Sequence, residues 1–323
     1  MSGKCSHSGC PDPDNIGCNV EGHLRLTDCR YYNKSDGDQK SSDDASGDLL
    51  RISWTGNSLG LMDLNFLTAC SRPILIGITG VASAGKTSFL ASLYCLLRSG
   101  RRIGEYSFSG SLTLYGWEDI AWFLSWKDNS NIQFPPHTTN NSGRVPGLLH
   151  LALRNQQNEK IDIILTDAPG EWFDHWRNNT QSENAKGARW IHEHCDAFLL
   201  FADCEMMAGA KRGYAKMQLN TVSDRIAENI GNRPLALIWS KSDIVVNSST
   251  KEQILTHIGE NQFEHFQEFE TSVHEGDDGR FHQGICNAIQ WAMEKVINNE
   301  NILASSETVI SNDMFLSKRQ INE

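Results

Sequence analysis

Residues 80–87 decide the fold of this chain, and they read Gly80-Val81-Ala82-Ser83-Ala84-Gly85-Lys86-Thr87. The stretch fits G-x-x-x-x-G-K-[ST], a loop whose backbone N–H groups surround phosphate oxygens. The apolar run 73–79 before it predicts a buried strand, and residues 88–97 after it, free of Gly and Pro, predict a helix. Because strand, glycine loop and helix are the context that such a loop needs, the stretch predicts a nucleotide-binding α/β domain.

Each residue type in the loop has a physical role. The two glycines let the backbone curl around phosphates, and the N-terminus of the following helix adds positive partial charge. Lys86 would reach the β- and γ-phosphates, and the Thr87 hydroxyl would ligate Mg²⁺. The predicted nucleotide-binding residues of this region are Gly80, Ser83, Ala84, Gly85, Lys86, Thr87 and Ser88.

Size and composition indicate a globular chain that does not enter a membrane. The 323 residues allow one or two domains with a sizeable core. The formal net charge of −11 argues against a broad surface for nucleic acids or anionic membranes. With neither a membrane-length apolar run nor a signal-peptide pattern, we expect a cytoplasmic protein whose cysteines are reduced or metal-bound.

Cysteines concentrate at the N-terminus, where four of the nine lie within thirty residues, at Cys5, Cys10, Cys18 and Cys29. A polar segment this short cannot bury a core, so a bound metal would be what orders it. Four thiolates suit tetrahedral zinc, and His7 or His23 could replace one of them. The alternative is a disordered tail with incidental thiols.

Composition divides the chain into four parts. Residues 1–30 form the Cys-rich tail, and residues 31–48, rich in Ser, Asp, Gly and Lys, form an acidic, flexible linker. Residues 49–298 form the nucleotide domain with an N-terminal packing segment, and residues 299–323 form a polar C-terminal tail. Hydrophobic patterning inside the domain predicts a mostly parallel sheet flanked by helices. The predicted strands are 104–114, 148–153, 161–166, 197–201, 235–239 and 266–271, and the predicted helices are 116–124, 210–229 and 284–297.

Two polar stretches beyond the loop fit the binding of Mg²⁺ and the γ-phosphate. Asp167-Ala168-Pro169-Gly170 has the form D-x-x-G and closes an apolar strand, so Asp167 would hold Mg²⁺ through water and the Gly170 N–H would face the γ-phosphate. The Asn-rich stretch 128–143 predicts a switch loop, although a bland insertion would read the same way. Within it, Thr138 is slightly favoured over Thr139 as the residue that reaches Mg²⁺.

Two further stretches predict the recognition of guanine. Ser240-Lys241-Ser242-Asp243 is a variant of N-K-x-D, and it follows an apolar strand. The Asp243 carboxylate can accept hydrogen bonds from guanine N1–H and the exocyclic amine, a donor pair that adenine lacks. The Lys241 stem would lie over the base, and Ser272 and Val273 would bring a backbone N–H to guanine O6. The alternative is an ordinary polar turn after a strand.

Taken in order, these motifs resemble those of translation-factor-related (TRAFAC) P-loop GTPases. More narrowly, residues 50 to 298 resemble the bacterial double-GTPase group that is linked to conflict and defence gene clusters. The stretches that carry this resemblance are 54–60, 72–74, 135–138, 146–151, 167–173 and 201–205. It implies a Ras-like sheet, GTP or GDP, Mg²⁺ and work through partner proteins, and the Cys-rich tail also resembles that group's N-terminus.

Two residues depart from the usual pattern. Ser240 stands where N-K-x-D has Asn, so the preference for guanine has less support from that side chain. Glu171 stands where Ras-like enzymes have a Gln that orients the attacking water. At about 5 Å from a γ-phosphate charge it would be repelled by about 3 kcal/mol per unit charge at an effective dielectric of 20. Glu171 therefore turns away or acts as a base beside a cation; the first is favoured and predicts slow hydrolysis. Arg144 is a weak candidate for an arginine finger.

The sequence thus predicts a Mg²⁺-dependent GTP hydrolase that works as a molecular switch. Its catalytic residues would be Lys86, Thr138, Gly170 and Glu171, and its Mg²⁺ ligands Thr87, Asp167 and Thr138. One alternative, motivated by Glu171, is a scaffold that holds GTP without turnover and recruits partner proteins through its tail. A second alternative is an ATPase, which requires the 240–243 motif to be discounted.

Overall fold

The structure is a computed structural model that describes residues 56–69, 71–124, 147–274 and 279–304, together with two short strands near the N-terminus. The chain separates into two compact units, Met1–Ile52 and Ser53–Glu323. The strands described in the first unit are β1 (Lys4–Cys5) and β2 (Tyr32–Asn33), which pair antiparallel. All of the predicted nucleotide-binding residues belong to the second unit.

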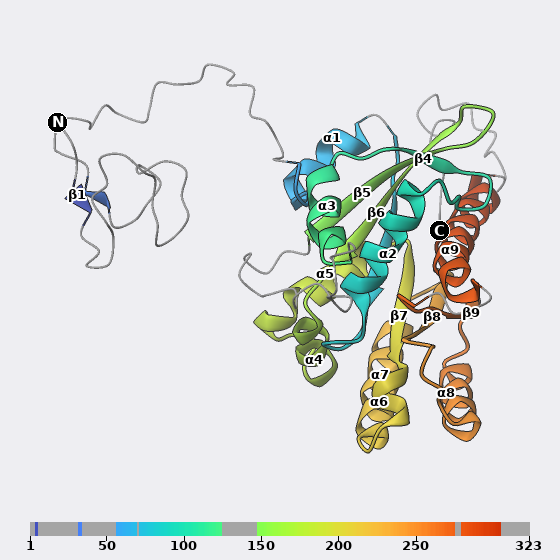
Figure 1. The fold of residues 1–323 in the computed structure, drawn as a ribbon. Coiled ribbons are helices and arrows are strands. Elements are labelled where there is room, and N and C mark those ends of the chain that lie inside the picture. The colour runs from blue at the N-terminus through green and yellow to red at the C-terminus, as the bar shows by residue number, and fades with distance from the viewer. Residues whose placement is uncertain are drawn as a thin grey trace, which may run out of the picture. The chain divides into compact units, whose positions relative to one another are not determined.

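A seven-stranded sheet lies at the centre of the second unit (Figure 1). Its order is β4-β5-β6-β3-β7-β8-β9. β5 runs antiparallel to both of its neighbours, and every other neighbouring pair is parallel. The predicted α/β fold with a mostly parallel sheet is therefore confirmed. The strands are β3 (Ile74–Thr79), β4 (Ser107–Gly110), β5 (Gly147–Arg154), β6 (Lys160–Asp167), β7 (Ala197–Asp203), β8 (Leu235–Ser240) and β9 (Phe266–Glu270).

Helices cover both faces of this sheet (Figure 1). Side chains of α2, α3 and α9 share one hydrophobic core with one face, and side chains of α4, α5, α7 and α8 share a second core with the other face. The helices are α1 (Leu64–Thr68), α2 (Lys86–Arg98), α3 (Leu114–Trp122), α4 (Gly170–Asn178), α5 (Lys186–His194), α6 (Cys204–Ala208), α7 (Arg212–Ala227), α8 (Ser248–Glu260) and α9 (Arg280–Ala304).

Strand β7 illustrates why the central strands consist mostly of apolar residues. Leu199 and Phe201 point into the core beside α2 and α9, whereas Phe198 and Leu200 point into the core beside α4 and α7. A parallel strand buried on both faces loses the alternation of apolar and polar residues. Because β3, β6, β7 and β8 run in the same direction, the loops that follow them open at one edge of the sheet, where the predicted site lies.

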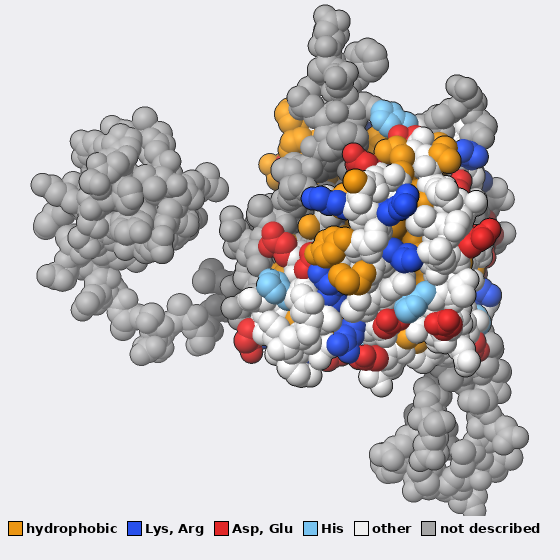
Figure 2. All heavy atoms as spheres, turned by 90° about the horizontal axis from the view of Figure 1, so that it is seen from below, with side chains coloured by type: hydrophobic (Ala, Val, Ile, Leu, Met, Phe, Trp, Pro, Cys, Tyr) orange, Lys and Arg blue, Asp and Glu red, His pale blue; other side chains and the backbone are white. Residues whose placement is uncertain are grey.

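Figure 2 shows the second unit from below, from the end where α4, α6, α7 and α8 lie in Figure 1. Acidic and basic side chains are interspersed over this face, and hydrophobic side chains gather near its middle. Tyr214 and Met217 of α7 are among the exposed large hydrophobic residues of the described chain. No helix within the described ranges is both long and apolar enough to cross a membrane.

Several element boundaries differ from the predictions. The edge strand predicted for 104–114 shrinks to β4, because residues 103–106 form a tight turn in which Gly104 has a φ of 58°. The last helix begins at Arg280 and continues to Ala304, so the start of the predicted polar tail is helical. Helices α1, α4, α5, α6 and α8 have no counterpart among the predicted elements.

A buried histidine–aspartate pair links β5 and β6 to the segment before α3. His150 is 2% exposed, and its Nε2 lies 2.9 Å from Asp162 Oδ1. The backbone N–H of Leu112 donates to His150 Nδ1 at 3.0 Å, which places the ring proton on Nε2 and makes the ring neutral. Burial lowers the pKa of His150 from its ordinary 6.5, although Asp162 opposes that shift.

We expect this pair to make the fold sensitive to acid. Since the pKa of His150 is lower in the folded than in the unfolded chain, the unfolded chain binds more protons as the pH falls below 6.5, and stability is lost. Urea unfolding at about pH 7 and about pH 5.5 measures this loss. His150→Gln removes the titrating group, so its free energy of unfolding should fall less than that of the wild type between these two pH values. An equal loss in both proteins would contradict the prediction.

Candidate nucleotide-binding site

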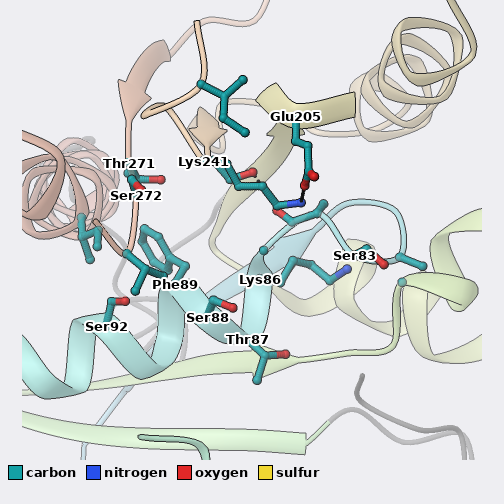
Figure 3. Close-up of a pocket in the computed structure, with 18 of the residues that line it drawn as sticks. Ser83, Lys86, Thr87, Ser88, Phe89, Ser92, Glu205, Lys241, Thr271 and Ser272 are labelled. Atoms are coloured by element: carbon teal, nitrogen blue, oxygen red, sulfur yellow. Dashed lines mark hydrogen bonds and ion pairs between the residues drawn. The ribbon is translucent and has the colours of Figure 1, made fainter. Parts of the chain in front are cut away.

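The loop of residues 80–85 connects β3 to α2 in the arrangement predicted from the sequence (Figure 3). Gly85 precedes the first helical residue and has a φ of 82°, a conformation that residues with a Cβ rarely adopt. A Cβ at this position would also lie 3.4 Å from the Cβ of Ser240. The loop therefore packs closely against the end of β8 and presents the N-terminus of α2 as an anion-binding group.

Lys86 lies inside the loop. Its Nζ donates to the carbonyl oxygens of Gly80 and Val81, both at 2.8 Å, and the residue is 6% exposed. Burial lowers the pKa of Lys86 to about 8, while the charges of Asp167 and Asp174 act in the opposite direction. A phosphate group beside Nζ would favour the protonated form, because an anion stabilises a neighbouring ammonium.

Thr87 and Asp167 come together as the sequence predicts. Thr87 Oγ1, in the first turn of α2, donates to Asp167 Oδ1, at the end of β6, at 3.1 Å. Hydroxyl and carboxylate oxygens are ligands that Mg²⁺ prefers, and Mg²⁺ is usually held by one or two protein groups plus phosphate oxygens and water. Within the described ranges, no group of three or more His, Cys, Asp and Glu residues is arranged to hold a metal alone. The pair thus fits a Mg²⁺ that arrives with a nucleotide.

Gly170 begins α4 and touches the phosphate loop. A Cβ on Gly170 would lie 2.2 Å from the backbone nitrogen of Ala82, so only glycine permits this approach. The side chain of Glu171 is exposed and lines the same cavity as Lys86. The predicted catalytic residues Lys86, Gly170 and Glu171 are therefore gathered at one place.

Ser240, which stands where N-K-x-D has Asn, contacts the phosphate loop through its hydroxyl. Its Oγ lies 2.8 Å from the carbonyl oxygen of Ala84 and 3.2 Å from that of Ala202, and the residue is 4% exposed. The hydroxyl therefore connects the end of β8 to the phosphate loop. This role was missed from the sequence, because Ala84 lies far away along the chain.

The predicted base-reading residues meet at one end of the cavity. Asp243 is exposed to it, and Ser272 Oγ donates to Asp243 Oδ1 at 2.5 Å. Val273 lines the cavity beside them. The sequence assigned Ser272 a role only through its backbone, whereas the structure shows that its side chain also orients the Asp243 carboxylate.

Lys241 lines the cavity as well, but its Nζ is held by two carboxylates. Asp203 Oδ2 and Glu205 Oε2 each lie 2.8 Å from it. Asp203 is the last residue of β7, and Glu205 lies in the first turn of α6. From the sequence these two acids appeared only within the stretch 201–205 that carried the family resemblance, and no role was assigned to them.

The cavity has a volume of about 610 Å³, which is within the range of ligand sites. It extends from the phosphate loop and the first turns of α2 to residues 240–244 and 271–274 (Figure 3). Thr138, Thr139 and Arg144 lie outside the described residues. So do the side chains of the predicted zinc ligands in the first unit, at Cys5, Cys10, Cys18 and Cys29, and the alternatives His7 and His23.

Comparisons with known proteins agree with this geometry. No curated protein sequence matches the chain. The family model of Double-GTPase 2 matches residues 74–292, about two thirds of the chain. The match runs from β3 into α9 and includes the phosphate loop, Asp167, Gly170 and Asp243. The chain therefore belongs to the Double-GTPase 2 family of P-loop GTPases.

Proposed function

We propose that this protein is a Mg²⁺-dependent GTP hydrolase that works as a molecular switch. The observation that carries the proposal is the convergence on one cavity of the phosphate loop, the Thr87–Asp167 pair, Gly170 and the Ser272–Asp243 pair. These groups come from four separate segments of the chain, 80–87, 167–170, 240–243 and 271–273, so their meeting is a property of the fold. Membership of a GTPase family supports the same reading.

The residues divide the work by their chemistry. Backbone N–H groups of the loop and the N-terminus of α2 would bind the phosphates, and Lys86 would neutralise charge on the β- and γ-phosphates. Thr87 and Asp167 would hold Mg²⁺, which neutralises further phosphate charge when it is bound. The Gly170 N–H would face the γ-phosphate, so loss of that group would release α4. Thr138 remains the favoured ligand from the switch loop.

Selectivity for guanine would come from hydrogen-bond matching. Ser272 donates to one oxygen of Asp243 and orients the carboxylate, whose remaining acceptor sites would accept from guanine N1–H and the exocyclic amine. Adenine would leave those sites unpaired, which costs about 1–3 kcal/mol or more for a charged group. This favours GTP over ATP and counts against the ATPase alternative.

Slow intrinsic hydrolysis is part of the proposal. Glu171 is exposed in the cavity, and a carboxylate about 5 Å from the γ-phosphate would be repelled by about 3 kcal/mol per unit charge. The same feature motivates the alternative of a scaffold that holds GTP without turnover. Action through partner proteins and a place in a bacterial defence system rest on the family resemblance of the quoted motifs.

Phosphate release from GTP and Mg²⁺ tests the hydrolase reading. Lys86→Ala should reduce release by about a hundredfold, the size of effect seen when one oxyanion-stabilising donor is removed. Lys211→Ala is the matched control, because Lys211 is exposed and does not line the cavity. Equal release by the wild type and Lys86→Ala would contradict hydrolysis at this site. Binding of GTP by the wild type without release would favour the scaffold.

The zinc prediction for Cys5, Cys10, Cys18 and Cys29 is retained as a proposal on composition alone. Four thiolates in a short polar segment would bind one zinc tightly enough to order it. Elemental analysis of metal-replete protein should find one zinc per chain, and replacing Cys18 and Cys29 by Ser should remove it. Absence of stoichiometric zinc in the wild type would refute the proposal.

A further inference from the structure

The ammonium of Lys241 sits between two carboxylates at the wall of the nucleotide cavity. Its Nζ lies 2.8 Å from Asp203 Oδ2 and 2.8 Å from Glu205 Oε2 (Figure 3 shows the pair with Glu205). The Lys241 side chain is 30% exposed, that of Asp203 is 6% exposed and that of Glu205 is 63% exposed. The two acids therefore differ in the strength with which they can hold the lysine, since exposed ion pairs contribute little.

Asp203 is fixed before it meets Lys241. Its Oδ1 accepts hydrogen bonds from the backbone N–H groups of Glu205 and Met206, at 2.9 and 3.2 Å, and so caps the N-terminus of α6. The cap leaves Oδ2 aimed at Lys241. An acid buried to this extent needs a partner, so the pair with Lys241 is strongly favoured.

Lys241 lies where its side chain could enter either of two cavities. It lines the nucleotide cavity and also a second cavity of about 310 Å³, which extends from the phosphate loop to α7. Its backbone has a φ of 56°, so the stem leaves the chain in an uncommon direction. A stem with four rotatable bonds could lean into either cavity, and the two acids select one placement.

The carboxylates also determine what Lys241 can contribute. Burial by itself would lower the pKa of Lys241, but its hydrogen bonds and ion pairs with Asp203 and Glu205 outweigh burial and raise it. The lysine is thus charged, yet its charge is matched locally by two acids. What remains for the cavity is the apolar stem, which can pack against a flat ring while the head group is held.

We propose that Asp203 and Glu205 are positioning residues for nucleotide binding, which hold the Lys241 stem as one wall of the base-binding end of the cavity. Asp203 is the principal residue because it is buried and capped, and Glu205 assists it. The inference rests on the proposed function, in that the cavity must bind a guanine nucleotide. It adds two acids, from a strand end that does not itself read the base, to the set that determines affinity.

The test is a double-mutant cycle measured with fluorescently labelled GDP. Asp203→Asn keeps an oxygen for the α6 cap but loses the charge, and it should weaken binding by about tenfold, the worth of one hydrogen bond to a charged group. Glu205→Gln, at an exposed position, should weaken binding by about two- to threefold. Lys241→Met keeps an unbranched apolar stem without the ammonium, and in that background neither change should matter further.

Two results would overturn the inference. One is an Asp203→Asn variant whose affinity for GDP is unchanged, provided that the nucleotide-free variant unfolds at the same temperature as the wild type. The other is an equal decrease in GDP affinity on Asp203→Asn in the wild type and in the Lys241→Met background. That result would mean that Asp203 acts on binding through the fold and not through the lysine. If Asp203→Asn does not fold, Glu205→Gln decides by the same comparison. Failure of the wild type to bind GDP would instead refute the proposed function, so the two failures are distinguishable.

Discussion

Gly170→Ala is expected to destabilise the protein and to abolish most GTP turnover. The added Cβ would lie 2.2 Å from the nitrogen and 2.4 Å from the Cα of Ala82, which are backbone atoms of the phosphate loop and cannot rotate away. Overpacking of this kind costs about 3 kcal/mol at the upper end of its usual range. Displacing the loop or α4 by about 1 Å also misplaces the phosphates, which costs about a hundredfold in rate.

Gly213→Ala is the matched control for this change. Gly213 lies in the first turn of α7, and a Cβ there would meet nothing within 4 Å. Alanine should therefore leave turnover unchanged and raise stability by about 0.5–1 kcal/mol through helix propensity. Urea unfolding and GTP hydrolysis measure both variants. Wild-type turnover by Gly170→Ala would refute the close approach of α4 to the phosphate loop.

Asp243→Asn is expected to invert the preference between guanine and xanthine nucleotides. Ser272 Oγ donates to Oδ1 of residue 243, so an asparagine would keep its oxygen toward Ser272 and turn its NH₂ toward the base. That NH₂ would face the guanine amine, which leaves two donors opposed and removes a hydrogen bond to a charged group. The loss for GTP should be about 3 kcal/mol or more.

Xanthine carries a carbonyl where guanine carries its amine, so it offers the new NH₂ an acceptor. Competition of GTP and XTP for the labelled-GDP site measures the ratio of affinities in the wild type and in Asp243→Asn. General damage to the fold would weaken both nucleotides alike, which makes the ratio the informative quantity. An unchanged ratio would mean that Asp243 does not read the base.

The phosphate loop and the central strands could be predicted because their signals are local. The loop 80–87 follows a strand and begins a helix in one continuous stretch, and β7 is apolar from Ala197 to Ala202. A parallel strand that is buried on both faces contains few polar residues, so it can be predicted from its composition. The order of the motifs then placed Asp167, Gly170 and Asp243 at the same edge of the sheet.

Two of the helices that were missed show why a short window was not enough. In α8 the buried residues are Ile254 and Ile258 alone, and α4 begins directly at the motif residue Gly170. Most helical stability in a protein comes from packing against partners, which a short sequence window does not contain. Two further interactions could not be predicted because the partners lie far apart in the sequence. They are the hydrogen bond from Ser240 to Ala84 and the ion pair of Lys241 with Asp203.

The central claim is that the cavity binds a guanine nucleotide through Asp243 and Ser272. Competition between unlabelled GTP and ATP for labelled GDP on the full chain, with Mg²⁺, tests it most directly. We expect GTP to compete about a hundredfold better than ATP or more, because adenine leaves the Asp243 carboxylate unpaired. Displacement by ATP at the same concentration as by GTP would contradict the claim.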